Sequence, residues 1–216
     1  LPIRRIGLFG NAKWGKFIYL SSLQIYQMRY FLLLLAFGLL QCTSEDQVDP
    51  ISSALSASKQ QFGLTVDFDN PSNYATQTKP GYVTKDNLGG NGILDKQATL
   101  GRILFYDKNL STDNNISCAS CHKQAFAFGD TAIQSLGVSN GKTIRHSMRL
   151  INARFANERK FFWDERANSL EAQTTIPIQD HLEMGFSGQS GRGNMTTLLA
   201  KLQAINYYPE LFTWAY

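Results

Sequence analysis

Residues 115–130, NISCASCHKQAFAFGD, hold the part of the sequence that decides the fold and the chemistry. Cys118 and Cys121 are two of the three cysteines in the chain, and His122 directly follows the second. Three kinds of site use such a trio: a disulfide redox pair, part of a zinc site, or the attachment point of a c-type heme. In the heme site the two thiols bond to the heme vinyl groups, and the histidine is the proximal iron ligand.

The rest of the sequence favours heme c over the other two sites. Zinc needs about four ligands, and the remaining candidates, Cys42, His146 and His181, show no paired spacing. A disulfide oxidoreductase would place its CxxC motif at the start of a helix that follows a strand, and no such pattern surrounds residues 118–121. We therefore predict one covalent heme c, with His122 as its iron ligand.

Residues 28–42, MRYFLLLLAFGLLQC, indicate export. Arg29 precedes an unbroken apolar run over residues 30–40, which is too short to cross a bilayer and suits a signal peptide. Cys42 then resembles a bacterial lipoprotein processing site, although Gln41 differs from the small residue usual there. We expect a leader over residues 1–41, with residues 28–41 as the signal peptide and residues 1–27 not genuine. The alternative is an uncleaved signal anchor.

The export signal implies a periplasmic protein, with a lipid anchor at Cys42 as its contact with the membrane. The formal charge of +4 arises in the leader, because residues 1–41 hold 5 of the 21 bases and no acid. The remainder has 16 bases and 17 acids. This balance gives no reason to expect a nucleic-acid partner.

Composition and periodicity predict an all-α domain with long loops. Residues 42–80 are rich in Ser, Thr, Asn and Asp, and we expect them to form a flexible tether before a domain at 81–216. Helical patterns begin at Asp95 and near Asn194, and CASCH is expected to open a short helix. A further helix is expected to begin with Asn168 as its N-cap and to end or kink at Pro177.

Three blocks of sequence carry a family resemblance: residues 100–130 around the CxxCH motif, FFWDERANSLEAQ at 161–173, and PIQDHLEMG at 177–185. In this order and spacing they resemble the bacterial diheme cytochrome c peroxidase family, which also contains the methylamine-utilisation diheme enzyme. The resemblance implies a class I cytochrome c-like domain that carries the N-terminal, peroxidatic heme. It also implies a C-terminal domain whose second heme receives electrons. This sequence has no second CxxCH, so we expect it to be a fragment of a longer protein.

The resemblance also implies roles for individual residues. Cys118, Cys121 and His122 match the heme attachment site, and Trp163 matches a tryptophan that lies between the two hemes. Gln173, Pro177 and Glu183 match residues of the distal pocket above the peroxidatic heme. The implied reaction reduces hydrogen peroxide to water, with electrons from a small cytochrome or a copper protein.

Two departures from the family pattern are informative. In the classical peroxidases of this family a histidine caps the resting peroxidatic iron, and Val138 stands at that position by ungapped spacing from His122. The resemblance is therefore to the subgroup whose peroxidatic heme is open. His146 replaces an asparagine that helps to bind calcium between the domains, after the matching Arg145. A neutral imidazole is a poor calcium ligand, so calcium is doubtful here.

The proposed catalytic role of Glu183 can also be argued from chemistry. A carboxyl group beside the iron could move a proton between the two peroxide oxygens, and burial would raise its pKa into a useful range. The plain alternatives are a solvated loop charge for Glu183, a core aromatic for Trp163 and a helix-surface residue for Gln173.

The alternative function is an electron-transfer cytochrome with a six-coordinate heme. Its sixth ligand would be Met148, Met184 or Met195, or else His146 or His181 in place of Val138.

Overall fold

The structure is a computed structural model that describes residues 55–88, 90, 92–156 and 160–216. The predicted leader at 1–41 and the predicted anchor at Cys42 lie outside the described residues and stay predictions. Within the described ranges, no helix has the length and the apolar character that a membrane span requires.

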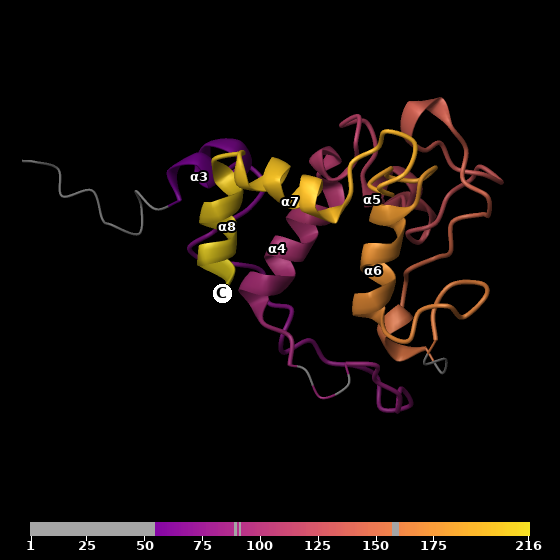
Figure 1. Cartoon of the computed structure of the whole chain (residues 1–216). Helices are drawn as coiled ribbons and strands as arrows, with labels where there is room; N and C mark the ends of the chain where they lie inside the picture. Colours follow the sequence, from indigo (N-terminus) through magenta and orange to yellow (C-terminus); the bar gives the residue numbers. More distant parts are fainter. Residues whose placement is uncertain (1–54, 89, 91, 157–159) are drawn as a thin grey trace, which may run out of the picture. The chain divides into compact units, whose positions relative to one another are not determined.

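Regular structure in the described part of the chain is helical (Figure 1). The α-helices are α3 (Ser56–Phe62), α4 (Asp95–Tyr106), α5 (Cys118–Cys121), α6 (Leu170–Gln179), α7 (Met195–Gln203) and α8 (Tyr207–Ala215). Four short 3-10 turns and long loops connect them, and the described residues form three isolated β-bridges but no strand. The prediction of a mostly helical domain with long loops is confirmed.

The core forms where α4 and α8 pack together. Leu100 and Ile103 on α4 lie one turn apart and are both buried, as the helical spacing predicts. On α8, Leu211 is fully buried and Tyr208 is 1% exposed. The contacts of α4 with α5 place the CxxCH motif against this core.

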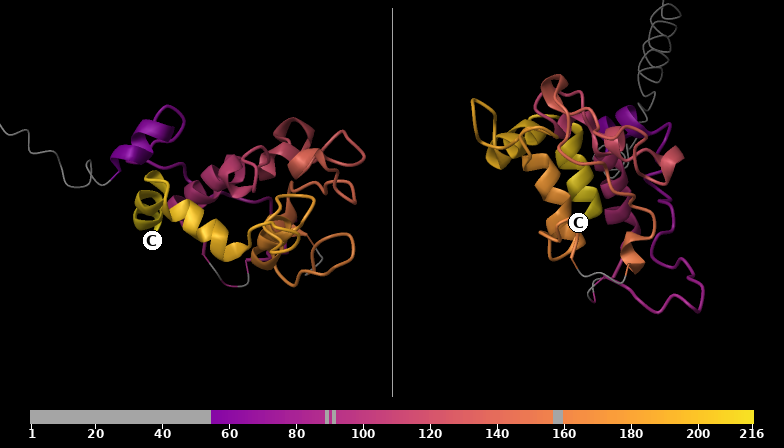
Figure 2. Two further views of the ribbon diagram at one scale, coloured as in Figure 1. Left: turned by 45° about the horizontal axis from the view of Figure 1, so that its top comes forward. Right: turned by 90° about the vertical axis from the view of Figure 1, so that its right-hand side faces the viewer.

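Part of the expected tether at 42–80 is instead packed into the domain. Helix α3 lies beside α8, and the views in Figures 1 and 2 agree on this arrangement. The carboxylate of Glu210 accepts a hydrogen bond from the Ser58 N–H at 2.8 Å, at the positively charged start of α3. Leu55 and Phe68 are buried, and Phe68 packs edge-on against Trp214. The polar mean composition of this segment concealed these few apolar anchors.

Several expected helix boundaries shift by a residue or two. Ser169, not Asn168, is the N-cap of α6, and its hydroxyl accepts from the Ala172 N–H at 3.1 Å. Pro177 lies inside α6, which continues to Gln179. Asn194 is the N-cap of α7, as predicted.

Asp95 lies inside α4, not at its N-cap, and ties the preceding chain to the helix. Its carboxylate accepts from the backbone N–H groups of Tyr74 at 2.6 Å and Ala75 at 2.8 Å. The loop at 74–75 is thereby fixed to the start of the helix that supports the motif.

Candidate active site

The CxxCH motif forms the single helical turn that was predicted. Helix α5 begins after Ser117, whose N–H donates to the hydroxyl of Ser120 at 3.0 Å. A spacing of three residues places Cys118 and Cys121 on the same side of this turn. Both cysteines are free, and both line one cavity of about 120 Å³.

Burial disfavours the thiolate form of both cysteines. Burial raises the pKa of Cys118 to about 11 and also raises the pKa of Cys121. Disulfide exchange needs a reactive thiolate, which catalytic CxxC motifs obtain by lowering the thiol pKa. This pair is shifted in the opposite direction, which argues against the disulfide redox alternative.

The ring of His122 has a fixed orientation. Its Nδ1 lies 2.9 Å from the backbone carbonyl oxygen of Phe128. Ala127 and Phe128 adopt left-handed backbone conformations, with φ of 56° and 58°, and these residues turn the chain back toward the motif. When Nδ1 donates to this carbonyl, Nε2 is left unprotonated and can bind a metal.

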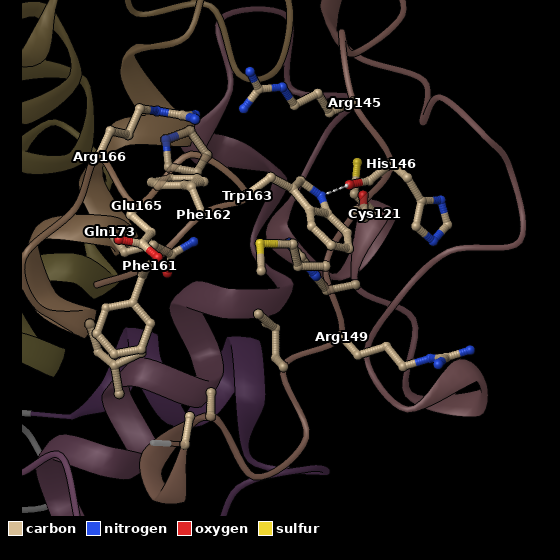
Figure 3. A pocket seen from close by; sticks show the side chains of 18 of the residues that line it. Cys121, Arg145, His146, Arg149, Phe161, Phe162, Trp163, Glu165, Arg166 and Gln173 are labelled. Carbon is tan, nitrogen blue, oxygen red and sulfur yellow. Dashed lines mark hydrogen bonds between the residues drawn. The ribbon is translucent and has the colours of Figure 1, made fainter. Parts of the chain in front are cut away.

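A second, larger cavity of about 410 Å³ adjoins the first, and Figure 3 shows side chains that line it. The two cavities share lining residues, so they lie next to each other beside the motif. The shared residues are Cys121, His122, Leu150, Gln173, Pro177 and Glu183. The structure therefore brings Gln173, Pro177 and Glu183 together with the CxxCH motif.

Helix α6 aligns two of these residues. Gln173 and Pro177 are four residues apart, which places them on the same face one turn from each other. Gln173 offers an amide that can both donate and accept, whereas Pro177 has no N–H and presents an apolar ring. One wall of the space is therefore polar at one end and apolar one turn further on.

Glu183 lies in the turn after α6 and is anchored through its backbone. Its N–H donates to the Asp180 carboxylate at 3.1 Å, and its carbonyl accepts from the Val138 N–H at 3.1 Å. Burial, and to a smaller extent the nearby Asp180 charge, raise the pKa of the Glu183 side chain to about 7, against an opposing effect of Arg166. Glu183 is therefore not a solvated loop charge, and it can gain and lose a proton near neutral pH.

Trp163 lines the larger cavity but is 61% exposed, so it is not a core aromatic. Its indole Nε1–H donates to the backbone carbonyl of His146 at 3.0 Å, the dashed line in Figure 3. The neighbouring Asp164 accepts from Arg145 and Arg166, each at 2.8 Å. The indole is thus fixed at its polar edge while much of the ring faces outward.

Val138 is 1% exposed and lines neither cavity. The candidates for a sixth iron ligand also differ in whether they line one of the two cavities. His146 and Met148 line the larger cavity, and Met184 lines the smaller one. His181 and Met195 line neither: Nδ1 of His181 lies 2.9 Å from the Ser187 hydroxyl, and Met195 packs against the core.

The expectation that calcium binding beside Arg145 is doubtful stays a prediction. His146 has its Nδ1 2.9 Å from the Ala132 carbonyl, and Arg145 pairs with Asp164. In the described ranges, no three His, Cys, Asp or Glu side chains gather as they would around a metal ion.

Sequence reasoning missed some residues of the site. Phe105 and Leu150 line the space near the motif, but apolar residues in a helix and a loop carry no signal of such a role. Asp130 was also not singled out, although its buried carboxylate holds the loop after the motif through an ion pair with the partly exposed Lys123. A lone aspartate in a Gly-Asp turn reads as an ordinary loop residue.

Comparison with known proteins shows the family of the chain. Residues 95–216 match the family described as di-haem cytochrome c peroxidase. This match covers more than half of the chain, so the chain belongs to the di-haem cytochrome c peroxidase family, whose members bind c-type heme.

Two curated relatives illustrate the extent of the match. The chain is 31% identical over 126 residues to the methylamine utilization protein MauG of Methylophilus methylotrophus, covering 58% of this chain and 35% of that protein. It is 37% identical over 102 residues to the cytochrome c551 peroxidase of Pseudomonas aeruginosa, covering 47% of this chain and 29% of that protein. The chain thus spans well under half the length of either relative.

A solved structure shares the fold. The crystal structure of a MauG-like protein associated with microbial copper homeostasis aligns with a TM-score of 0.55 and 27% identity, covering 67% of this chain and 40% of that chain.

The residues of the site fit a c-type heme. Two reduced thiols on one side of a helical turn and an imidazole whose Nδ1 faces a backbone carbonyl line one cavity, and a larger, mostly apolar cavity lies next to it. This donor set and this apolar enclosure are what covalent heme attachment needs.

Proposed function

We propose that this chain is the peroxide-reducing heme domain of a di-heme peroxidase. Cys118 and Cys121 would hold the heme through thioether bonds, and His122 would bind its iron through Nε2. The observation that carries the proposal is the placement of Glu183. Its carboxyl group, with a pKa raised to about 7, lines the same cavity as the two thiols and the imidazole.

The reaction converts hydrogen peroxide, two electrons and two protons into two waters. When bound, the heme supplies the redox-active iron at which peroxide takes up electrons. Glu183 can accept a proton from one peroxide oxygen and return it to the other, so that the second oxygen leaves as water. A carboxyl group with a pKa near the working pH is suited to both transfers.

The other lining residues orient the substrate and limit its surroundings. The Gln173 amide can hold the peroxide or a water by hydrogen bonding. Pro177, Leu150 and Phe105 contribute apolar surface, which disfavours stray water beside the reacting oxygens and strengthens the polar contacts that remain.

Trp163 is suited to pass electrons into the site. Its indole is fixed by the His146 carbonyl, lines the larger cavity and has an exposed face. We propose that a second heme domain of the full-length protein covers this face. The electrons would come from a small cytochrome or a copper protein in the periplasm, where lipid at Cys42 would hold the protein to the membrane.

An electron-transfer cytochrome domain is the second candidate. Met148 and Met184 each line one of the two cavities, and either could supply a thioether as the sixth ligand. The raised pKa of Glu183 has no role in that function, so we place it second.

Electron paramagnetic resonance of the ferric heme separates the two functions. The chain would carry serine at position 42 and would be matured in a periplasm that attaches heme c. A high-spin signal that hydrogen peroxide converts is expected of a peroxidase. A low-spin signal that is inert to peroxide would show that a side chain fills the sixth position, and the electron-transfer function would replace the proposal.

A further inference from the structure

Asp130 lies on the loop after the CxxCH motif and is the acceptor for an unusual number of donors. Its side chain is 3% exposed. One carboxylate oxygen accepts from the Lys123 ammonium at 2.7 Å and from two backbone N–H groups, those of Thr131 at 2.7 Å and Ala132 at 3.3 Å. The other accepts from the Ser135 hydroxyl at 2.7 Å. Burial alone would raise the pKa of Asp130, but these hydrogen bonds hold it well below its ordinary value, so the group stays charged.

One branch of this network reaches His122. Lys123 and Asp130 pair across the two ends of the loop at 123–130, and the Lys123 N–H also donates to the Gly129 carbonyl at 2.8 Å. The Phe128 N–H donates to the Lys123 carbonyl at 3.0 Å. The loop is thus closed, and its fixed Phe128 carbonyl is the group that holds Nδ1 of His122.

The other branch reaches Trp163. The fully buried Ser135 lies 2.9 Å from the Ser147 hydroxyl, and its N–H donates to the Thr143 hydroxyl at 3.0 Å. These contacts join the Asp130 loop to the segment at 143–147. The carbonyl of His146 in that segment is the acceptor for the Trp163 indole.

A second contact strengthens the branch to Trp163. The Ala132 N–H donates to Asp130, while the Ala132 carbonyl lies 2.9 Å from Nδ1 of His146. His146 is therefore held at its ring by the Asp130 loop and presents its own carbonyl to Trp163. The path from the carboxylate to the indole thus consists of hydrogen bonds linked through single residues.

We propose that Asp130 is a positioning residue that fixes the His122 imidazole and the Trp163 indole together, through the Phe128 carbonyl and the His146 carbonyl. A charged acceptor makes stronger hydrogen bonds than a neutral one, and a buried network loses more than one contact when its centre is removed. The orientation of the iron ligand and of the aromatic ring on the electron path thereby depends on one carboxylate. The role toward heme rests on the proposed function, whereas the placement of the two rings does not.

The test measures how fast the two ring protons exchange with water. In the heme-loaded, reduced chain with carbon monoxide bound, the iron is diamagnetic, and proton NMR can follow the His122 Nδ1–H and the Trp163 Nε1–H. The Trp214 Nε1–H, which donates to the Phe68 carbonyl at 3.2 Å, is an internal reference far from the network. Exchange requires local opening, so a weakened acceptor appears as a faster rate.

Asp130→Asn should speed exchange about tenfold at both His122 and Trp163 while leaving Trp214 unchanged. Two further variants separate the branches. Lys123→Met keeps the apolar stem and should speed exchange at His122 more than at Trp163. Ser135→Ala should do the reverse, because it breaks the connection to the segment at 143–147. These milder variants also keep the test available if Asp130→Asn does not fold.

Asp107→Asn is the matched control. The Asp107 carboxylate also accepts several hydrogen bonds, from Tyr208 at 2.6 Å, Tyr207 at 3.2 Å and the Asn109 N–H, but it lines neither cavity of the candidate site. It should leave exchange at His122 and Trp163 as in the unmodified chain. Equal acceleration of all three protons by Asp130→Asn would show a general loss of stability and would overturn the proposal, as would unchanged exchange at His122. Failure to attach heme would instead count against the proposed function, because the Trp163 proton can still be followed without it.

Discussion

Gly137 and Leu182 approach so closely that a Cβ atom on Gly137 would lie 1.8 Å from the Leu182 carbonyl oxygen. The next residue, Val138, donates its N–H to the Glu183 carbonyl. The turn that carries Glu183 therefore packs against the backbone at 137–138 and is hydrogen-bonded to it. The contact between Gly137 and Leu182 links a loop after the motif to the candidate proton donor.

Gly137→Ala should disturb the packing of the turn at 182–183 against residues 137–138. The added methyl group has no room, so the turn at 182–183 must shift, and we expect a loss of roughly 1–3 kcal/mol in unfolding free energy. Peroxide should also react more slowly, because Glu183 moves with the turn. Chemical denaturation and stopped-flow kinetics measure the two effects.

Gly101→Ala is the control for that substitution. Gly101 is an exposed position within α4 with no neighbouring atom in the way of a methyl group. Alanine there should stabilise the helix by about 0.5–1 kcal/mol. If the two variants had the same unfolding free energy and the same rate with peroxide, the close approach at Gly137 would contribute neither to stability nor to the reaction.

Glu183→Gln should slow the reaction of the ferric heme with hydrogen peroxide by about 10²-fold or more, since the amide cannot take up and return a proton. Glu171→Gln, an exposed change in the first turn of α6, should leave the rate as it is. Stopped-flow absorbance follows the reaction directly. An unchanged rate for Glu183→Gln would remove this residue from the mechanism.

The pH dependence of Glu183 has a defined sign. The unprotonated form accepts the first proton, so the rate should rise as pH increases through about 7, and Glu183→Gln should lack this rise.

The stability of the folded chain should change with pH in the opposite direction. Because the pKa in the folded chain is raised above its ordinary value of 4.5, folding favours the protonated form, and unfolding free energy should fall between about pH 4.5 and pH 7. Urea unfolding at several pH values should show a shallower decline in the variant.

Replacement of both Cys118 and Cys121 by alanine should abolish covalent heme attachment, because no thiol of the motif remains to form a thioether bond. A heme stain after denaturing electrophoresis measures this directly. Each single variant should retain weaker staining through its remaining cysteine. A full signal in the double variant would show that heme is attached elsewhere or not through these thiols.

Lys201→Met should destabilise the domain by about 2 kcal/mol, since a charged donor with several acceptors is lost. The Lys201 ammonium donates to the backbone carbonyls of Asn109 at 2.6 Å and Ser111 at 2.9 Å, and also to the Asn114 side chain. It thus ties α7 to the loop that leads into the CxxCH motif. Thermal unfolding measures the loss, and Lys108→Met, at an exposed position, should have little effect.

Local features of the structure could be predicted from the sequence. The helical turn at CASCH, the N-cap at Asn194 and the shared face of Leu100 and Ile103 depend on residues close together in the chain. The structure also agrees with the rise in the pKa of Glu183 that was expected from burial, although the resemblance, and not periodicity, singled out this residue.

Features that depend on distant partners were missed. Helix α3 (residues 56–62) is held in place by a hydrogen bond to Glu210 and by packing against α8. Both partners lie some 150 residues further along the chain. The hydrogen bond of Trp163 to His146, and the several donors that meet at Asp130, likewise depend on how loops fold over one another. No local sequence pattern predicts these hydrogen bonds, because the partners lie neither on one helix nor in a sequence repeat.

The burial of Val138 has an evolutionary consequence. Its side chain lies against the position of Gly185, is part of the buried core, and lines neither cavity. A histidine introduced there would have to displace core packing before it could reach the iron. We therefore expect that a change from valine to an iron-binding histidine at this position would require a rebuilt loop and not a single substitution.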